Sequence, residues 1–210
     1  MFTGIIQAIG SIQSIDINDQ KGRLTISYPN GFDVYEAGES IAVNGVCLTA
    51  TDFTEDSFAV DLSAETLKRT SFSQLDLSAK VNLERSLTLD QKMSGHFVMG
   101  HVDCVAMVTD VQIRSGEVLF RFEYPKDFAS NFIEKGSVAV DGISLTVFDC
   151  LEEKFTVSIV PFTLKHTNLH ERKIGDHVNI ECDMIGKYVH KACESILKAD
   201  QKEGKTTRKF

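Results

Sequence analysis

The 210-residue sequence has no surplus of positive charge, no closely paired cysteines and no long hydrophobic run. Its formal net charge of -8 argues against a general nucleic-acid binder, because such a protein needs a basic face for phosphates. No apolar run approaches the ~20 residues of a membrane span. The first ten residues also lack the basic and apolar regions of a signal peptide. These absences predict a soluble cytoplasmic protein that engages neither nucleic acid nor a membrane.

The cysteines argue against both a disulfide framework and a metal centre. There are five, at positions 47, 104, 150, 182 and 193, and none forms a CxxC pair. An odd, scattered set is typical of a reducing compartment. The histidine and cysteine spacings match no compact zinc pattern, so we predict no metal site. The sequence also has no GxGxxG motif after a strand, which argues against a nicotinamide-dependent flavin reductase.

The sequence contains two tandem copies of one unit. Three blocks align at a constant offset of 97 residues: 37–49 with 134–146, 58–70 with 155–167, and 80–84 with 177–181. Gly4 aligns with Gly100 at an offset of 96, so one insertion or deletion falls between. The period is too long for a solenoid of short stacked units. The repeat therefore predicts two tandem homologous domains, with a boundary near residues 87–94.

Each copy has the pattern of short β-strands. Phe58, Val60 and Leu62 alternate with polar or small residues, and the segment 118–124 does the same in the second copy. Turn signals such as Asn44-Gly45 separate the runs. Several short strands in a unit of roughly 90 residues predict a small closed barrel or sandwich. The matched segments 65–70 and 162–167 predict a short helical turn after a strand.

The C-terminal segment has a helical pattern instead. Ile185, Val189, Ala192 and Ile196 recur at steps of four, three and four residues, which places them on one narrow helix face. Two alternatives remain open: the face packs on the barrel of its own chain, or it forms a short coiled coil between identical chains. The polar residues 201–210 are expected to be a frayed tail.

A six-residue motif that occurs in both copies differs chemically between them. NGVCLT, residues 44–49, becomes DGISLT, residues 141–146. The shared pattern is explained by a glycine turn that leads into a strand. The exchanges of Asn44 for Asp141 and of Cys47 for Ser144 instead favour two related pockets with unequal roles. His101 takes the place that Ile5 has in the first copy, which is no packing substitution, whereas the other five histidines are interpreted as structural.

These motifs together resemble one family. MFTGII at the start, GESIAVNGVCLT, SGHFVMGHVD, KGSVAVDGISLT and the twofold repeat are similar to riboflavin synthase of the homotrimeric α type. The resemblance covers nearly the whole chain. It implies an all-β fold of two tandem six-stranded Greek-key barrels, 1–90 and 91–183. A trimerisation helix, 184–200, and the tail, 201–210, follow them.

The resemblance also implies a reaction. Two molecules of 6,7-dimethyl-8-ribityllumazine exchange a four-carbon unit and give riboflavin and 5-amino-6-ribitylamino-2,4-pyrimidinedione. The reaction needs no cofactor and no metal, because the substrate is its own electron sink. The implied partners are two lumazines per site and two further copies of the chain, and an association with a lumazine synthase is left open. The rival interpretation is a non-catalytic antenna protein that binds a lumazine or a flavin.

The resemblance assigns the site residues. The expected catalytic residues are Ser40, Cys47, His101, Asp141 and Ser144. His101 is the candidate base, since its ordinary pKa of about 6.5 suits proton abstraction from the 7-methyl group. The other half of the chemistry needs a nucleophile that adds to the ring, which can be water, a ribityl hydroxyl or a side chain. Ser40 and Cys47 match the family positions for this half. Asp141 and Ser144, with Thr146, match the polar residues of the second pocket.

The expected substrate contacts come from both copies. They are Gly4, Ile5, Ile6, Cys47, Leu48, Thr49, Asp61, Leu62, Ser63, Ala64, Glu65, Thr66, Gly100, His101, Val102, Lys135, Ser144, Leu145, Thr146, Ser158, Ile159, Val160, Pro161, Phe162 and Thr163. Most are expected to act through backbone donors and acceptors. Met99 and Phe162 depart from the family pattern.

Overall fold

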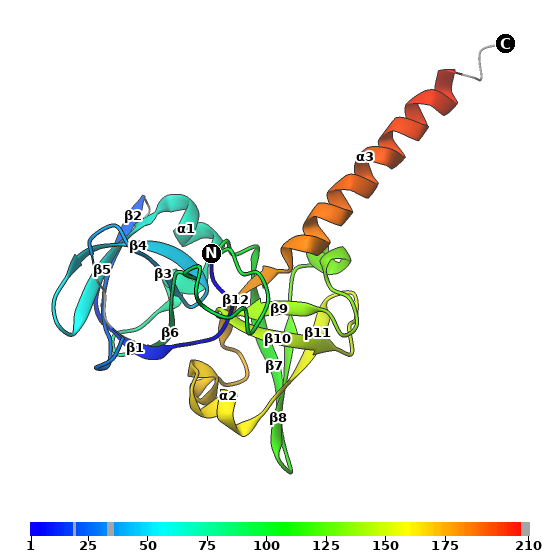
Figure 1. Cartoon of the computed structure of the whole chain (residues 1–210). Helices are drawn as coiled ribbons and strands as arrows, with labels where there is room; N and C mark the ends of the chain where they lie inside the picture. Colours follow the sequence, from blue (N-terminus) through cyan, green and yellow to red (C-terminus); the bar gives the residue numbers. More distant parts are fainter. Residues whose placement is uncertain (19, 33–35, 207–210) are drawn as a thin grey trace.

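The structure is a computed structural model that describes residues 1–18, 20–32 and 36–206 as two β-barrels and a projecting helix (Figure 1). The first barrel consists of β1 (Ala8–Ile17), β2 (Lys21–Ser27), β3 (Ser40–Val43), β4 (Val46–Phe53), β5 (Ser57–Ser63) and β6 (Lys80–Arg85). Helix α1 (Ala64–Arg69) and the short 3-10 helix η1 (Ser71–Gln74) lie between β5 and β6.

The second barrel repeats this arrangement. It consists of β7 (Cys104–Arg114), β8 (Glu117–Glu123), β9 (Ser137–Val140), β10 (Ile143–Phe148), β11 (Lys154–Ile159) and β12 (His177–Cys182), with η2 (Lys126–Asn131), α2 (Pro161–Lys165) and η3 (Asn168–Glu171) between strands. Around the first barrel the order is β1-β2-β5-β4-β3-β6, and around the second it is β7-β8-β11-β10-β9-β12. The predicted pair of tandem six-stranded barrels is thus confirmed, as are the helical turns after β5 and β11.

The strands form because their alternating apolar residues fill each barrel. Leu24 and Val60 on neighbouring strands are fully buried in the first barrel. In the second, the rings of Phe122 and Phe155 pack 5.4 Å apart. Each barrel has its own hydrophobic cluster, which is why each copy of the sequence closes its own sheet.

The repeated motif, residues 44–49 and 141–146, begins in a two-residue hairpin turn. Asn44-Gly45 joins β3 to β4, and both residues have positive φ angles of 44° and 74°. Asp141-Gly142 joins β9 to β10 in the same way, with φ angles of 44° and 80°. Asn-Gly and Asp-Gly are the sequences that this turn type favours. The shared asparagine or aspartate and glycine thus have an architectural explanation.

The two turns meet where the barrels touch. A Cβ atom on Gly45 would lie 2.6 Å from the backbone nitrogen of Gly142, so a side chain there would force the barrels apart. A second contact is the antiparallel bridge between Phe2, ahead of the first barrel, and Val98, ahead of the second. The N-terminal segment of each copy therefore lies beside the other copy's segment, and the barrels form one body.

Helix α3 (Met184–Thr206) follows the second barrel and projects away from it (Figure 1). The predicted narrow face is open: Ile185, Val189 and Ile196 are 60%, 58% and 61% exposed. In the single chain this face does not pack on the barrel. The helix also continues into the expected tail as far as Thr206, and residues 207–210 lie outside the described part. Among the described helices, none is long and apolar enough to cross a membrane.

Candidate active site

The exchange of Asn44 for Asp141 lies in the barrel interface. Both side chains are 0% exposed. The backbone N–H of Asn82 donates to Asn44 Oδ1 over 2.8 Å, and the backbone N–H of Asn179 donates to Asp141 Oδ1 over 2.8 Å. Asn168 also donates from Nδ2 to both side chains, over 3.1 Å each. The two positions are therefore centres of a buried polar network that joins the two halves.

The charge of Asp141 has a partner that the first half lacks. Arg172 Nη2 donates to Asp141 Oδ2 over 2.6 Å, and the carboxylate raises the pKa of the Arg172 guanidinium. The position that matches Arg172 in the first copy is Leu75. Two changes between the copies thus occur together, since a buried carboxylate needs a cation and a buried amide does not.

This placement separates Asp141 from the other expected catalytic residues. Its carboxylate has no exposed surface and is occupied by Arg172, Asn168 and Asn179. Asp141 therefore has no surface with which to contact a substrate. We propose a structural role for it in place of the catalytic one.

The first group of expected residues gathers beside β4. Ser40 on β3 is paired in register with Thr49 on β4. The backbone N–H of Cys47 donates over 2.9 Å to the carbonyl of Gly100, in the segment ahead of β7. Gly100 has φ +78°, and a Cβ atom on it would lie 2.5 Å from Cys47 Cβ. The backbone of His101, the next residue, therefore lies close to Cys47 of the other barrel. We name Ser40, Cys47, Thr49, Gly100 and His101 the first cluster.

The exposed His101 also borders a largely apolar hollow at the base of α3. This hollow has a volume of about 400 Å³. Its lining residues are Met99, His101, Met184, Lys187, Tyr188 and Lys191. The base of α3 therefore lies within reach of the first cluster.

The second group of expected residues gathers beside β10 in the equivalent way. The backbone N–H of Ser144 donates over 2.8 Å to the carbonyl of Gly4, so the segment of Ile5 and Ile6 ahead of β1 lies beside the second barrel. His96 Nδ1 is 2.7 Å from Ser144 Oγ. We name Gly4, Ile5, His96 and Ser144, with Thr146, the second cluster.

His96 is a candidate functional residue that sequence reasoning treated as structural. Burial lowers its pKa, although Asp183 opposes the shift, so the ring favours its neutral form. A neutral imidazole in contact with a hydroxyl can accept its proton, as in the activation of serine nucleophiles. The signal in the sequence was its position within SGHFVMGHVD, but no spacing in that motif points to Ser144, 48 residues away.

The expected contact segments occupy equivalent places on the two barrels. Residues 61–66 run from the end of β5 into α1, and residues 158–163 run from β11 into α2. The side chains of Leu62 and Ile159 are buried in the barrel cores, so at these two positions only the backbone is available to a ligand. Lys135 lies beside the end of β10: its backbone N–H donates over 2.9 Å to the carbonyl of Val147, and its Nζ is 5.3 Å from the ring centre of Phe148.

The two short helices carry different side-chain pairs at matched positions. On α1, Arg69 forms an ion pair with Glu65 one turn earlier. On α2, the ring of Phe162 stacks on His166 with centres 4.1 Å apart, and Phe162 is 72% exposed. Because Phe162 departs from the family pattern, α2 carries a pair of stacked rings at the positions where α1 carries an ion pair.

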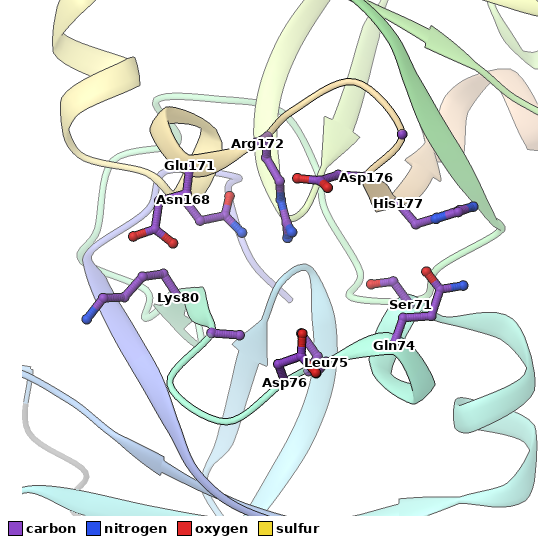
Figure 2. A pocket seen from close by; sticks show the side chains of 12 residues that line it. Ser71, Gln74, Leu75, Asp76, Lys80, Asn168, Glu171, Arg172, Asp176 and His177 are labelled. Atoms are coloured by element: carbon purple, nitrogen blue, oxygen red, sulfur yellow. The ribbon is translucent and has the colours of Figure 1, made fainter.

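A polar cavity of about 310 Å³ lies between the barrels (Figure 2). The first copy lines it with Ser71, Gln74, Leu75, Asp76, Ala79 and Lys80, and the second with Asn168, Glu171, Arg172, Gly175, Asp176 and His177. None of the expected site residues lines it. Among the described residues, no group of three histidine, cysteine, aspartate or glutamate side chains is placed to hold a metal ion.

Comparison with known proteins agrees with this geometry. The model of the lumazine binding domain matches twice, at residues 3–86 and 99–183. Each match includes the segment ahead of a barrel that contacts the other barrel. The riboflavin synthase of Bacillus subtilis (strain 168) is 44% identical over 199 residues, which cover 93% of each chain. The chain belongs to the riboflavin synthase family.

The family likeness extends to distant species and to solved structures. The riboflavin synthase of Schizosaccharomyces pombe is 36% identical, over 93% of this chain and 95% of that protein. The crystal structure of LumP complexed with riboflavin matches with a TM-score of 0.81 at 26% identity, over 87% of this chain and 99% of that one. LumP complexed with 6,7-dimethyl-8-(1'-D-ribityl) lumazine gives a TM-score of 0.79 at 25% identity, over 86% and 98%. The solved relatives thus hold family ligands on this fold.

Proposed function

We propose that the protein is a transferase that converts two molecules of 6,7-dimethyl-8-ribityllumazine into riboflavin and 5-amino-6-ribitylamino-2,4-pyrimidinedione, the last step of riboflavin biosynthesis. One lumazine gives up four carbons and the other accepts them, so no further reactant is consumed. The curated relatives at 36% to 44% identity are riboflavin synthases, which favours the enzyme over the non-catalytic antenna protein.

The pair of unequal clusters favours this reaction. Both are built alike, with a strand of one barrel hydrogen-bonded to the segment ahead of the other. They differ in their reactive groups, a thiol with His101 in one and the Ser144 hydroxyl with His96 in the other. A reaction between two copies of one substrate needs two similar sites with different chemistry.

In the first cluster, His101 acts as the base that removes a proton from the acidic 7-methyl group. Ser40 and Cys47 supply the nucleophile for addition to the ring. In the second cluster, Ser144 contacts the lumazine and His96 takes or returns the hydroxyl proton. The segments 61–66 and 158–163 hold the ring edges and the ribityl chains, mainly through their backbone.

We propose that α3 directs the assembly. Its open face of Ile185, Val189, Ala192 and Ile196 favours a bundle between identical chains, and the family resemblance implies a homotrimer. In that trimer the first cluster of one chain faces the second cluster of its neighbour, so that the two lumazines meet. The unpaired cysteines suit a cytoplasmic location. Association with a lumazine synthase is a further family expectation that co-sedimentation can test.

The direct test is incubation of the purified protein with the lumazine alone. The proposal predicts that riboflavin absorbance appears and that two lumazines disappear for each riboflavin formed. An antenna protein would instead bind the lumazine and leave its amount unchanged.

A further inference from the structure

Two buried carboxylates, Glu84 on β6 and Glu181 on β12, take no part in the chemistry described so far. They occupy equivalent positions in the two copies, and each is 3% exposed. Burial raises the pKa of both carboxyl groups. A buried carboxylate is unfavourable unless hydrogen bonds satisfy it, so the partners of these two groups indicate what they do.

Glu181 accepts three consecutive backbone N–H groups. Its Oε1 accepts from Met99 over 2.7 Å, and its Oε2 accepts from Gly100 over 2.8 Å and from His101 over 2.9 Å. Successive N–H groups that converge on one anion form a rigid turn around it. The backbone of the candidate base is therefore held by this carboxylate.

The same turn continues to the thiol of the first cluster. Gly100 donates its N–H to Glu181, and its carbonyl accepts the N–H of Cys47 over 2.9 Å. Glu181 thus lies two hydrogen bonds from the backbone of Cys47. His101 and Cys47 come from different barrels, and this chain of contacts fixes one relative to the other.

We propose that Glu181 is a positioning residue for the first cluster, holding His101 and Cys47 at a fixed separation while touching neither the substrate nor their side chains. The expected loss of activity rests on the proposed function. The expected change in the surroundings of Cys47 rests on the hydrogen bonds alone. A misplacement of about 1 Å in a reacting group can lower a rate on the order of 100-fold.

Glu84 provides a matched control within the same chain. It accepts from Thr3 N over 2.7 Å, from Thr3 Oγ1 over 2.8 Å and from Gly4 N over 3.0 Å. The carbonyl of Gly4 then accepts the N–H of Ser144. The chemistry of the two glutamates is the same, but Glu84 serves the second cluster and has no contact with the turn at Cys47.

The substitution Glu181→Gln keeps the size of the side chain and removes one acceptor. Its NH₂ group donates, so in either orientation it faces at least one backbone N–H that also donates. The turn must shift to relieve this contact. Glu84→Gln makes the same change in the second cluster. Glu181→Asp keeps both carboxylate oxygens but shortens the side chain by one methylene. This variant replaces Glu181→Gln in the experiment if the glutamine variant does not fold.

The experiment compares the wild-type chain with Glu181→Gln and Glu84→Gln in two assays. The first measures kcat and KM for riboflavin formation. The second measures alkylation of Cys47 by iodoacetamide, with peptide mass analysis to separate it from the exposed Cys193. We expect Glu181→Gln to lower kcat about tenfold or more with a smaller change in KM. It should also change the Cys47 alkylation rate, while Glu84→Gln leaves that rate at the wild-type value.

A Glu181→Gln or Glu181→Asp protein with wild-type kcat and wild-type Cys47 alkylation would overturn the proposal. So would an equal change in Cys47 alkylation in the Glu84 and Glu181 variants, which would indicate general loosening. Absence of riboflavin formation by the wild-type chain would instead contradict the proposed function. In that case the contrast in Cys47 alkylation still decides whether Glu181 positions the cluster.

Discussion

Cys47 donates its backbone N–H across the barrel boundary to the carbonyl of Gly100, 2.9 Å away. Ser144 makes the matching bond to Gly4 over 2.8 Å. Each barrel therefore completes its cluster with a segment that belongs to the other copy in sequence. This exchange explains why one chain carries both copies, since an isolated barrel lacks half of its cluster.

Replacement of His101 by glutamine should abolish most activity without loss of the fold. A positioned general base contributes roughly 100-fold or more to a rate, so we expect kcat to fall by about that factor. His101 is exposed, so the melting temperature should change little. His177→Gln, away from both clusters, is the control and should retain activity. Equal losses of activity and stability would instead indicate a packing role for His101.

The thiols should differ in reactivity according to burial. Burial raises the pKa of Cys104 to about 12 and also raises the pKa of Cys182, and only a thiolate reacts readily. We expect iodoacetamide to modify Cys193 and Cys47 in the folded protein, and Cys104 and Cys182 only after unfolding. Saturating lumazine should protect Cys47 and leave Cys193 reactive. If lumazine does not protect Cys47, the substrate does not bind at the first cluster.

The pair Asp141–Arg172 can be tested by copying the first half of the chain. Arg172→Leu leaves a buried carboxylate without its cation and should lower the free energy of unfolding by about 3 kcal/mol or more. The double variant Asp141→Asn, Arg172→Leu reproduces Asn44 and Leu75 and should recover most of that loss, because the two sites are coupled. Denaturant unfolding gives both values. If Asp141 has a structural role, the double variant should be active. A double variant that folds but is inactive would indicate that Asp141 takes part in catalysis.

The stability contribution of His96 should depend on pH. Burial lowers its folded-state pKa below the ordinary value of 6.5, so the unfolded chain binds more protons in the window between these two values. Stability from this group is therefore present above pH 6.5 and is lost as the pH falls through the folded pKa. Chemical unfolding across this range should show a smaller slope in His96→Asn than in the wild-type chain. Identical slopes would mean that His96 is not held neutral.

The helix α3 is predicted to set the oligomer. Removal of the residues from Met184 onward should give particles of smaller mass in sedimentation, since the open face of Ile185, Val189 and Ile196 is then lost. The barrels have their own cores, so the truncated chain should remain folded. A truncated chain that keeps the mass of the full assembly would show that other surfaces hold it together.

Periodicity and turn chemistry predicted the strands because both are local, and the repeat at an offset of 97 residues is visible in the sequence without knowledge of any contact. The alternation at Phe58, Val60 and Leu62 and the Asn44-Gly45 turn each depend on a few neighbouring residues. The site was less accessible, because its contacts join distant residues. His96 meets Ser144 across 48 residues, and Asp141 is explained by Arg172, whose equivalent in the first copy is Leu75. The sequence shows that both positions changed, but only the structure shows that they touch.

The first cluster of one chain and the second cluster of its neighbour should together form one working site, and refolded mixtures of two inactive variants test this. One variant carries Ser40→Ala and Cys47→Ala, which disables the first cluster, and the other carries His96→Ala and Ser144→Ala, which disables the second. Each should be inactive alone. Unfolded together and refolded as mixed assemblies, they should regain part of the riboflavin-forming activity, because some interfaces then join two intact clusters. Absence of activity at every mixing ratio, with both chains present in one assembly, would contradict a site shared between chains.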